Sequence, residues 1–424
     1  MNERHKRELV TYLLFDYEGI EEHLEKMAAR GWFLETPGNQ IWTYRKGEPA
    51  EVKYAVTYVP KASQFDPEPI PEQKTLEEFC GEAGWQKVGY WLQAQIFMNY
   101  DAHAVPLETE EEVRLEVIRH AMKKSFVPAH VVLTLLVLFN LWRASNSFFD
   151  DPLAYLSGYG SLLSMLVQPI AAVLVAANLI GYYVWLHRSA KSVEAGGSCV
   201  NPKFVRMVNR WQLPVIGVYF IAMIAGLGAE GNGAAARYMV FYMIGFFCLV
   251  ALLNATKNFM KKRGASRGKN MAVFIIVDII GAFAMVAVVM WLVFSGETSG
   301  MEGADPYAPE VHETFLVKQT SGELETPPIS YDMNQIKVSG LYDWCLKSRL
   351  SQKYYKTMFM HYEPDSEAKA ALWGADQVYY CDWGNGRWIL TKDNYIVEIW
   401  IELWDDETLE DAEKSRILTQ LGIS

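Results

Sequence analysis

An acidic residue inside an apolar stretch is the sharpest candidate for chemistry in this chain of 424 residues. Asp278 lies about two helical turns into the apolar run Met271 to Phe294. A carboxylate inside a membrane is costly unless it is paired, protonated or in contact with water. Asn254 and Gln168, in two other apolar runs, could complete a proton or cation site with it. The alternatives are a structural hydrogen bond to a nearby helix, or an ion pair with the basic cluster at 257–269.

Two further candidates lie near the C-terminal end. The tryptophans Trp383, Trp388 and Trp400 are expected to form an aromatic face that suits contact with a peptide, a glycan or the cell wall. Packing in the core or against the membrane surface is the alternative. Cys345 and Cys381 can form a disulfide if this region lies outside the cell, and two thiols are the alternative.

Several classes of function find no support in the sequence. The eight histidines and five cysteines do not recur at metal-ligand spacing, and there is no Gly-rich phosphate loop, nucleophile elbow or Walker motif. We therefore predict no catalytic residues, no cofactor and no metal, and we do not expect an enzyme. The net charge of -11 and the lack of a Lys/Arg stripe with interleaved aromatics argue against nucleic-acid binding.

Five apolar segments are long enough to cross a membrane as helices, because a hydrocarbon core of roughly 30 Å requires about 20 residues. They are Phe126 to Trp142, Ser161 to Leu186, Leu213 to Ala229, Tyr238 to Thr256 and Met271 to Phe294. The first and third are near the lower length limit, so a soluble buried helix is the alternative for each. The first span begins far beyond the place of a signal peptide, so we expect insertion by the spans themselves.

The charges of the loops predict the orientation. The loops after the second and fourth spans are rich in Lys and Arg, whereas the loops after the first and third are balanced and the fifth span is followed by acidic residues. Because short cytoplasmic loops are enriched in Lys and Arg, we expect a multi-pass protein of the cell membrane. Its N-terminus is expected in the cytoplasm and its C-terminus outside.

The spans separate two regions that read as soluble. Residues 1–105 predict strand, helix, strands, helix, strands, which is typical of an α+β domain with helices on one face of a ferredoxin-like sheet. The repeated helix-Gly-Trp-strand pattern, at Gly31 and again at Gly84, indicates an internal duplication. Residues 106–125 predict a juxtamembrane helix, which either continues into the first span with a kink at Pro128 or acts as a spacer.

The remaining boundaries follow from composition. Residues 126–295 form the predicted five-helix transmembrane domain, and residues 296–313 resemble a flexible tether. Residues 314–424 predict an extracytoplasmic α+β domain with a strand meander and a final helix.

The N-terminal region also resembles a known family. It contains LFDYEGIEEHLEKMAARGWFLE, then YRKGEPAEVKYAVTY and FCGEAGWQKVGYW. These segments resemble bacterial membrane proteins, mostly from Gram-positive Firmicutes, that are catalogued as domain of unknown function 2812, and the resemblance covers Leu9 to Tyr100. Such proteins are often encoded beside PadR-type transcription regulators, so the resemblance implies a role in a regulated membrane or stress response. It supplies no catalytic residues.

Two functional hypotheses follow. In the first, the chain is a membrane-embedded sensor or regulator that couples the extracytoplasmic domain to a cytoplasmic domain. That domain would bind a protein partner, either a transcription regulator or another membrane component. In the second, the chain is a transporter or a lipid-handling component that uses the helix bundle around Asp278. A homo-oligomer could then complete the pathway.

Overall fold

The computed structural model describes residues 5–101, 103–108, 110–229, 233–300, 308–351, 353–354, 358–359, 362–381, 386–401 and 409–423. The chain divides into two compact units. The first comprises Met1–Leu138, Ile170–Val218 and Met243–Ala287, and the second comprises Phe139–Pro169, Tyr219–Tyr242 and Val288–Ser424.

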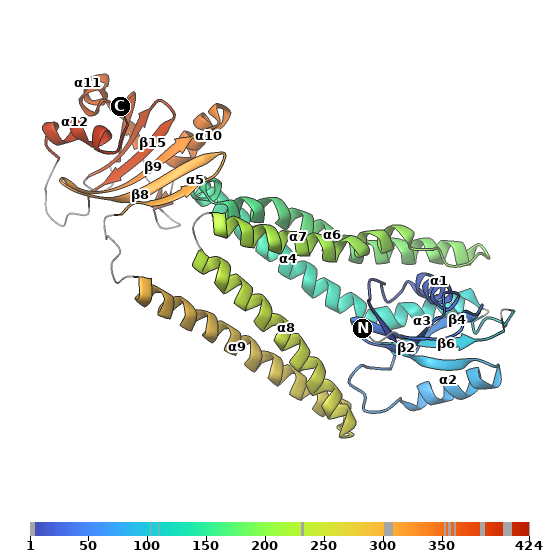
Figure 1. Cartoon of the computed structure of the whole chain (residues 1–424). Helices are drawn as coiled ribbons and strands as arrows, with labels where there is room; N and C mark the ends of the chain where they lie inside the picture. Colours follow the sequence, from blue (N-terminus) through green and yellow to red (C-terminus); the bar gives the residue numbers. More distant parts are fainter. Residues whose placement is uncertain are drawn as a thin grey trace. The chain divides into compact units, whose positions relative to one another are not determined.

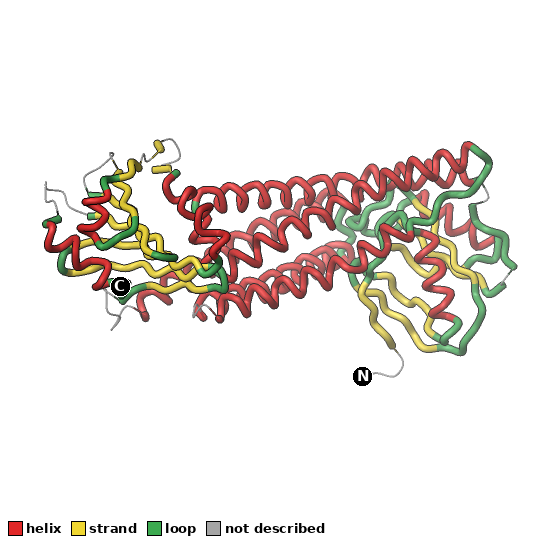
Figure 2. The backbone as a smooth tube through the Cα atoms, turned by 90° about the horizontal axis from the view of Figure 1, so that it is seen from above, coloured by secondary structure: helices red, strands yellow, loops and turns green. Residues whose placement is uncertain are grey.

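Among the described residues, five helices are long and apolar enough to cross a membrane. Figure 2 draws the helices in red. The five are α4 (Phe126–Asp150), α6 (Tyr159–Glu194), α7 (Lys203–Ala229), α8 (Gly233–Lys262) and α9 (Arg267–Gly300). Each contains one of the five predicted segments, which indicates a multi-pass membrane protein. The helices are longer than the apolar runs because polar residues at their ends continue the helical hydrogen bonding.

The juxtamembrane helix α3 (Glu111–Lys124) ends at Ser125, immediately before α4. The interruption therefore lies three residues before Pro128, where the sequence predicted a kink. Pro128 instead occupies the first turn of α4, where a missing N–H costs no helical hydrogen bond.

The N-terminal domain contains two copies of one β-α-β-β arrangement. The first copy is β1 (His5–Leu9), α1 (Tyr17–Ala28), β2 (Trp32–Pro37) and β3 (Ile41–Lys46), and the second is β4 (Lys53–Tyr58), α2 (Pro71–Glu82), β5 (Gln86–Trp91) and β6 (Ala94–Asn99). Each copy forms a three-stranded antiparallel sheet, in the orders β1-β3-β2 and β4-β6-β5. Gly31 and Gly84 follow the two helices with φ of 79° and 82°. The matching orders support the predicted duplication, but the two sheets differ from the single ferredoxin-like sheet that the sequence predicted.

The two helices pack on opposite faces of the second sheet (Figure 1). All six residues of β6 are buried. Phe97 packs with Cys80 of α2, whereas Ile96 belongs to the cluster that contains Leu24 of α1. Neighbouring residues in a strand point to opposite faces, so helices cover both faces rather than the one face that was predicted.

The second unit contains a β-rich domain. Its sheet has seven antiparallel strands in the order β12-β13-β14-β15-β9-β8-β7. The strands are β7 (Glu310–Glu313), β8 (Val317–Glu325), β9 (Pro328–Ile336), β12 (Tyr362–Pro364), β13 (Gln377–Cys381), β14 (Arg387–Lys392) and β15 (Tyr395–Trp400). A separate two-stranded sheet pairs β10 (Lys353–Tyr354) with β11 (Met358–Phe359). The predicted strand meander corresponds to β13, β14 and β15.

Helices cover both faces of the seven-stranded sheet. Leu390 and Val397 pack in one cluster that contains residues of α11 (Glu367–Trp373) and α12 (Asp411–Gln420). Ile389 and Ile396 pack in another, with residues of α10 (Ser339–Leu350) and of α5 (Pro152–Ser157), which connects α4 to α6. The helix α5 is therefore part of the core of the β-rich domain.

Candidate functional site

The N-terminal domain and the apolar helices share one hydrophobic core in the first unit. Phe15 is completely buried there. The centroid of its ring lies 5.4 Å from that of Phe126 on α4, and 5.3 Å and 5.0 Å from those of Tyr182 and Trp185 on α6. Aromatic pairs at such distances contribute about 0.5–1.5 kcal/mol each beyond their burial. The rings therefore attach the domain firmly to two of the apolar helices.

A buried ion pair lies beside this aromatic cluster. The Arg206 guanidinium on α7 donates from Nε and Nη2 to the two carboxylate oxygens of Asp16, both at 2.6 Å. The Asp16 side chain is 1 % exposed and that of Arg206 is 23 % exposed. Bidentate pairs of this kind fix orientation as well as distance.

Asp16 has a second role in the same geometry. Its Oδ1 accepts from the Gly19 N–H at 3.2 Å and so caps the first turn of α1. One carboxylate therefore joins the start of a domain helix to the start of an apolar helix. A displacement of either helix must stretch bonds to the other.

The close approach of the two helices depends on Gly19. A Cβ atom at this position would lie 2.5 Å from Cζ of Arg206, well inside van der Waals contact. The guanidinium cannot move aside without losing Asp16. A larger residue at position 19 would therefore have to displace the guanidinium from Asp16.

An amide network extends the junction. Asn209 on α7 donates to the carbonyl oxygen of Thr11 at 2.7 Å and accepts from Asn178 on α6 at 3.1 Å. Asn178 is 3 % exposed. Since burial of an amide costs free energy unless it is hydrogen-bonded, this chain of bonds specifies the relative position of the domain, α6 and α7.

The remaining two apolar helices contact the segment between β4 and α2. Lys257 of α8 donates to Oε1 of Gln64 at 3.2 Å, and Asn270 of α9 donates to the carbonyl oxygen of Phe65 at 3.0 Å. The Phe65 ring also packs against Phe274, with 5.3 Å between the centroids. Each of the five apolar helices thus contacts the N-terminal domain within the first unit.

Acidic side chains of α1 cover the edge strand β4. The N–H groups of Tyr54 and Val56 donate to Glu25 at 3.4 Å and to Glu21 at 2.7 Å, which satisfies strand groups that would otherwise be open to pairing. These residues line a cavity of about 340 Å³ that also contains Arg114. Burial raises the pKa of Glu21 to about 8, although Val56 and Arg114 oppose the shift.

A buried arginine organises the β-rich domain in the other unit. The side chain of Arg349 on α10 is 5 % exposed. It contacts Asp332 of β9, Nε lies 2.8 Å from Glu398 of β15, and Nη1 lies 3.6 Å from Asp151. Burial by itself lowers the pKa of Arg349, but the carboxylates of Glu398, Asp332 and Asp151 raise it overall. Sequence reasoning missed this cluster, although Glu398 inside the apolar strand Tyr395–Trp400 was a signal for it.

Hydrogen bonds extend this cluster to α5. The Ser157 hydroxyl donates to Oε1 of Gln319 at 2.8 Å, and Gln319 donates to Asp332 at 3.0 Å. The Thr314 hydroxyl donates to the carbonyl oxygen of Leu156 at 2.6 Å. The β-rich domain is therefore attached to the connection between α4 and α6 by polar bonds as well as by apolar packing.

The three polar residues of the predicted intramembrane site do not bond to one another in the described ranges. Asn254 donates to the carbonyl oxygen of Val250 in its own helix at 3.1 Å and accepts from Lys257. Gln168 donates to Ser164 at 2.8 Å and belongs to the second unit. Asp278 is exposed on α9 and forms no hydrogen bond or ion pair with another residue of the described ranges. The proton or cation site stays a prediction.

The predicted aromatic face is divided by the register of the strands. Trp383 lies outside the described residues. Trp388 pairs with Ile399 across the strands β14 and β15, whereas Trp400 pairs with Arg387. The ring centroid of Trp388 lies 5.4 Å from that of Trp373. Since adjacent residues of a strand point to opposite faces, Trp388 and Trp400 do not share a face.

The two C-terminal cysteines lie in one apolar cluster. Cys345 and Cys381 are both buried there, and both are thiols in this structure. Burial raises the pKa of Cys345 to about 11, which disfavours the reactive thiolate. Within the described ranges, no group of three or more His, Cys, Asp or Glu side chains is placed to hold a metal ion.

A comparison with known families concerns the N-terminal part of the chain. The family described as "Protein of unknown function (DUF2812)" matches residues 16–130. This segment matches the DUF2812 family and is called the DUF2812 domain from here on. The match is about a quarter of the 424 residues. It begins at Asp16 and ends in the first turns of α4, so it includes Asp16 of the junction but not Thr11 or Phe15. No match was found among curated proteins or among solved structures.

Proposed function

We propose that the chain is a membrane-embedded sensor or regulator in which the DUF2812 domain transmits the state of the apolar helices to a protein partner. The observation that carries the proposal is the bidentate bond between Asp16 and Arg206 beside the ring cluster of Phe15. A domain that was merely tethered to the helices would not need a buried ion pair shared by α1 and α7. In this proposal the chain has no catalytic role.

The orientation is part of the proposal. The ends of α6, α7, α8 and α9 that adjoin the DUF2812 domain are rich in Lys and Arg, and such ends favour the cytoplasmic side of the cell membrane. The DUF2812 domain would then lie in the cytoplasm, where it can bind a transcription regulator or another membrane component. The β-rich domain would lie on the opposite side.

The physical basis of coupling is the continuity of the helices. The helices α4, α6 and α7 each contribute residues to both units. A change that shifts α7 along or about its axis would move Arg206, and with it the capped first turn of α1. Coupling between distant sites requires an element with two arrangements that both sites bias, and α7 with its bonded partner α1 is our candidate for that element.

The test is a quantitative pull-down of the full-length protein after crosslinking in intact cells. We expect a partner that is enriched with the wild type and whose recovery changes several-fold in the Arg206→Gln variant. Arg263→Gln is the matched control, because Arg263 also follows an apolar helix but contacts only the Phe259 ring among the described interactions. Equal recovery from all three proteins, or no enriched partner, would contradict the proposal.

Asp278 favours a second candidate function, transport or lipid handling through the helix bundle. Asp278 is exposed near the middle of the span Arg267–Trp291. A carboxylate that faces lipid is costly, so it would require protonation or contact with a helix of another copy. Flux of protons or cations in proteoliposomes that is lost in Asp278→Asn would favour this function over the first, and absence of flux would remove it.

A further inference from the structure

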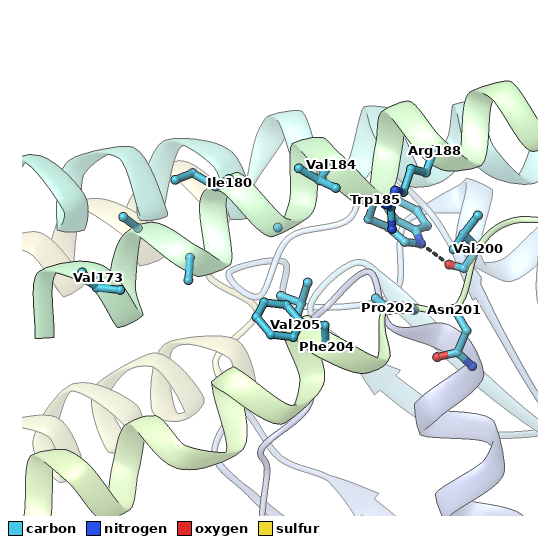
Figure 3. A pocket seen from close by; sticks show the side chains of 13 residues that line it. Val173, Ile180, Val184, Trp185, Arg188, Val200, Asn201, Pro202, Phe204 and Val205 are labelled. Atoms are coloured by element: carbon cyan, nitrogen blue, oxygen red, sulfur yellow. Dashed lines mark hydrogen bonds between the residues drawn. The ribbon is translucent and has the colours of Figure 1, made fainter. Parts of the chain in front are cut away.

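An apolar groove lies on the first unit, between α6 and the start of α7 (Figure 3). Its volume is about 470 Å³, within the roughly 300–1,000 Å³ of small-molecule sites. On α6 its lining residues recur at three- and four-residue spacing from Val173 through Ile180 and Val184 to Arg188. This spacing places them along one side of the helix.

The groove is formed by close packing at its floor and exposed walls. At Gly181 a Cβ atom would lie 2.6 Å from a methyl group of Val205, so α6 and α7 approach closely there. Ile180, Val173 and Phe204 are 61 %, 67 % and 69 % exposed. These side chains belong to helices that can span a membrane, so the groove opens where acyl chains are the solvent.

One end of the groove is polar and positively charged. Arg188 is the charged residue among those that line it, and Asn201 is the other side chain there with hydrogen-bonding groups besides Trp185. The Trp185 N–H is already used, because it donates to the carbonyl oxygen of Val200 at 2.6 Å (Figure 3). Arg188 is exposed and forms no ion pair with any side chain in the described ranges.

The neighbouring charges leave Arg188 and Lys203 as the available cations. Arg206, on the following helix, is neutralised by Asp16. Lys203 begins α7 directly after Pro202, a lining residue, and has no acidic partner among the residues described. The first N–H groups of a helix have no acceptors within it and attract phosphate. The charged end of the groove therefore complements an anion, whereas its remainder complements a hydrocarbon chain.

We infer that this groove binds an anionic phospholipid, with one acyl chain along α6 and the phosphodiester beside Arg188. The distance along α6 from Val173 to Arg188 is about 22 Å at the rise of an α-helix, which exceeds the roughly 15 Å depth of one leaflet. Basic pockets between membrane helices are established sites for lipid head groups. The site is separate from the residues around Asp278, and its occupancy does not depend on the coupling role proposed above.

The test uses two photoreactive phospholipids with the same acyl chains, one with a phosphatidylglycerol and one with a phosphatidylcholine head group. Each is added to the full-length protein in phosphatidylcholine nanodiscs, and labelled peptides are identified by mass spectrometry. We expect phosphatidylglycerol to label residues 173–205 about fivefold more than phosphatidylcholine, because one basic side chain at a membrane surface contributes about 1 kcal/mol.

Two variants separate the head group from the chain. Arg188→Gln should reduce the ratio of the two labels towards one, with Arg263→Gln as the charge control. Ala177→Phe fills the groove and should reduce labelling by both lipids, with Ala282→Phe on the exposed side of α9 as the control. A functional fold of each variant is verified by an unchanged elution profile and unchanged labelling elsewhere.

Four results would overturn the inference. The first three are equal labelling by the two lipids in the wild type, labelling that is not concentrated in residues 173–205, and loss of the preference on addition of millimolar glycerol 3-phosphate. The third result would assign the charged end to a soluble phosphate. A crosslink between two copies of the chain at Ala177 would likewise assign the groove to a protein interface and contradict lipid binding.

Discussion

Each unit contains an ion-paired arginine at the place where a domain contacts the helical part of the chain, but the two differ in burial and in the number of carboxylates that hold them. Arg206 has one carboxylate partner, Asp16, and its side chain is 23 % exposed. Arg349 has three, and its side chain is 5 % exposed. A pair with one partner can open when one helix moves, whereas loss of Arg349 leaves several carboxylates buried together. We therefore expect Arg206 to mediate a change of state and Arg349 to maintain the fold.

The largest effect is expected from Arg349→Met. The variant leaves Asp332 buried without its cation and Glu398 with the more distant Arg387, at 3.6 Å, and breaking a buried pair in this way costs about 3–5 kcal/mol. Hydrogen exchange of full-length protein in nanodiscs should show faster exchange throughout β9 and β15. Lys347→Met is the control, because Lys347 is exposed on the same helix. If the two variants exchange alike, the Arg349 cluster does not maintain the domain.

The effect of Gly19→Ala on stability is expected to change sign when Arg206 is replaced. Gly19→Ala alone should weaken the junction by about 1–3 kcal/mol, because the added methyl group overlaps the guanidinium held by Asp16. In the Arg206→Gln background the same substitution should be neutral or stabilising by up to about 1 kcal/mol, since alanine is the better helix former. Thermal unfolding is monitored by proteolysis of the DUF2812 domain in the wild type, the two single variants and the double variant. The midpoints give the effect of Gly19→Ala in each of the two backgrounds. A penalty that is equal in the two backgrounds would show that Gly19 and Arg206 are not in contact.

The stability of the N-terminal domain is expected to depend on pH through Glu21. The pKa of Glu21 is raised to about 8, so its neutral form is the one that the fold favours. The contribution of Glu21 to stability is complete below its ordinary pKa of 4.5 and is lost as the pH rises towards 8. We expect faster exchange in α1 and β4 at pH 8.5 than at pH 6, after correction for the intrinsic rate. Glu21→Gln should remove this difference, and a difference that persists in the variant would assign it to another group.

The smallest effect is expected at Asp151, the outermost carboxylate around Arg349. Its oxygen lies 3.6 Å from Nη1 and its side chain is 36 % exposed, so solvent screens the interaction. Asp151→Asn should reduce stability by less than about 1 kcal/mol. Exchange in α5 and β8 measures the change. A loss as large as that of Arg349→Met would mean that Asp151, rather than Asp332 and Glu398, determines the position of the arginine.

The sequence predicted those parts of the molecule that local patterns determine. The five apolar helices follow from the length of the apolar runs, and the start of α1 follows from Asp16 as a cap. The end of α11 follows from Gly374, which adopts φ of 69°. Repetition of the Gly-Trp pattern correctly indicated two copies of one arrangement, because it reports the same helix end and strand start twice.

The parts that were missed depend on contacts between distant residues. Asp16 and Arg206 are 190 positions apart, and no local pattern relates them. The division of the strands into two sheets depends on burial of β6 on both faces, which a short apolar strand does not distinguish from burial on one. Asp278 was prominent because a carboxylate inside an apolar run is costly whatever its partners, and the run itself is visible in the sequence. The residues that bond across the junction are ordinary polar residues near helix ends.

A double-mutant cycle at Asp16 and Arg206 tests the central claim most directly. Exchange at the first turn of α1 is measured in full-length protein in nanodiscs for the wild type, Asp16→Asn, Arg206→Gln and the double variant. Asparagine retains the helix cap, so the cycle isolates the bond between the helices. We expect faster exchange in each single variant, extending from α1 into β4, and a double variant that is no worse than either. Additive effects confined to the substituted residues would contradict coupling between the DUF2812 domain and α7.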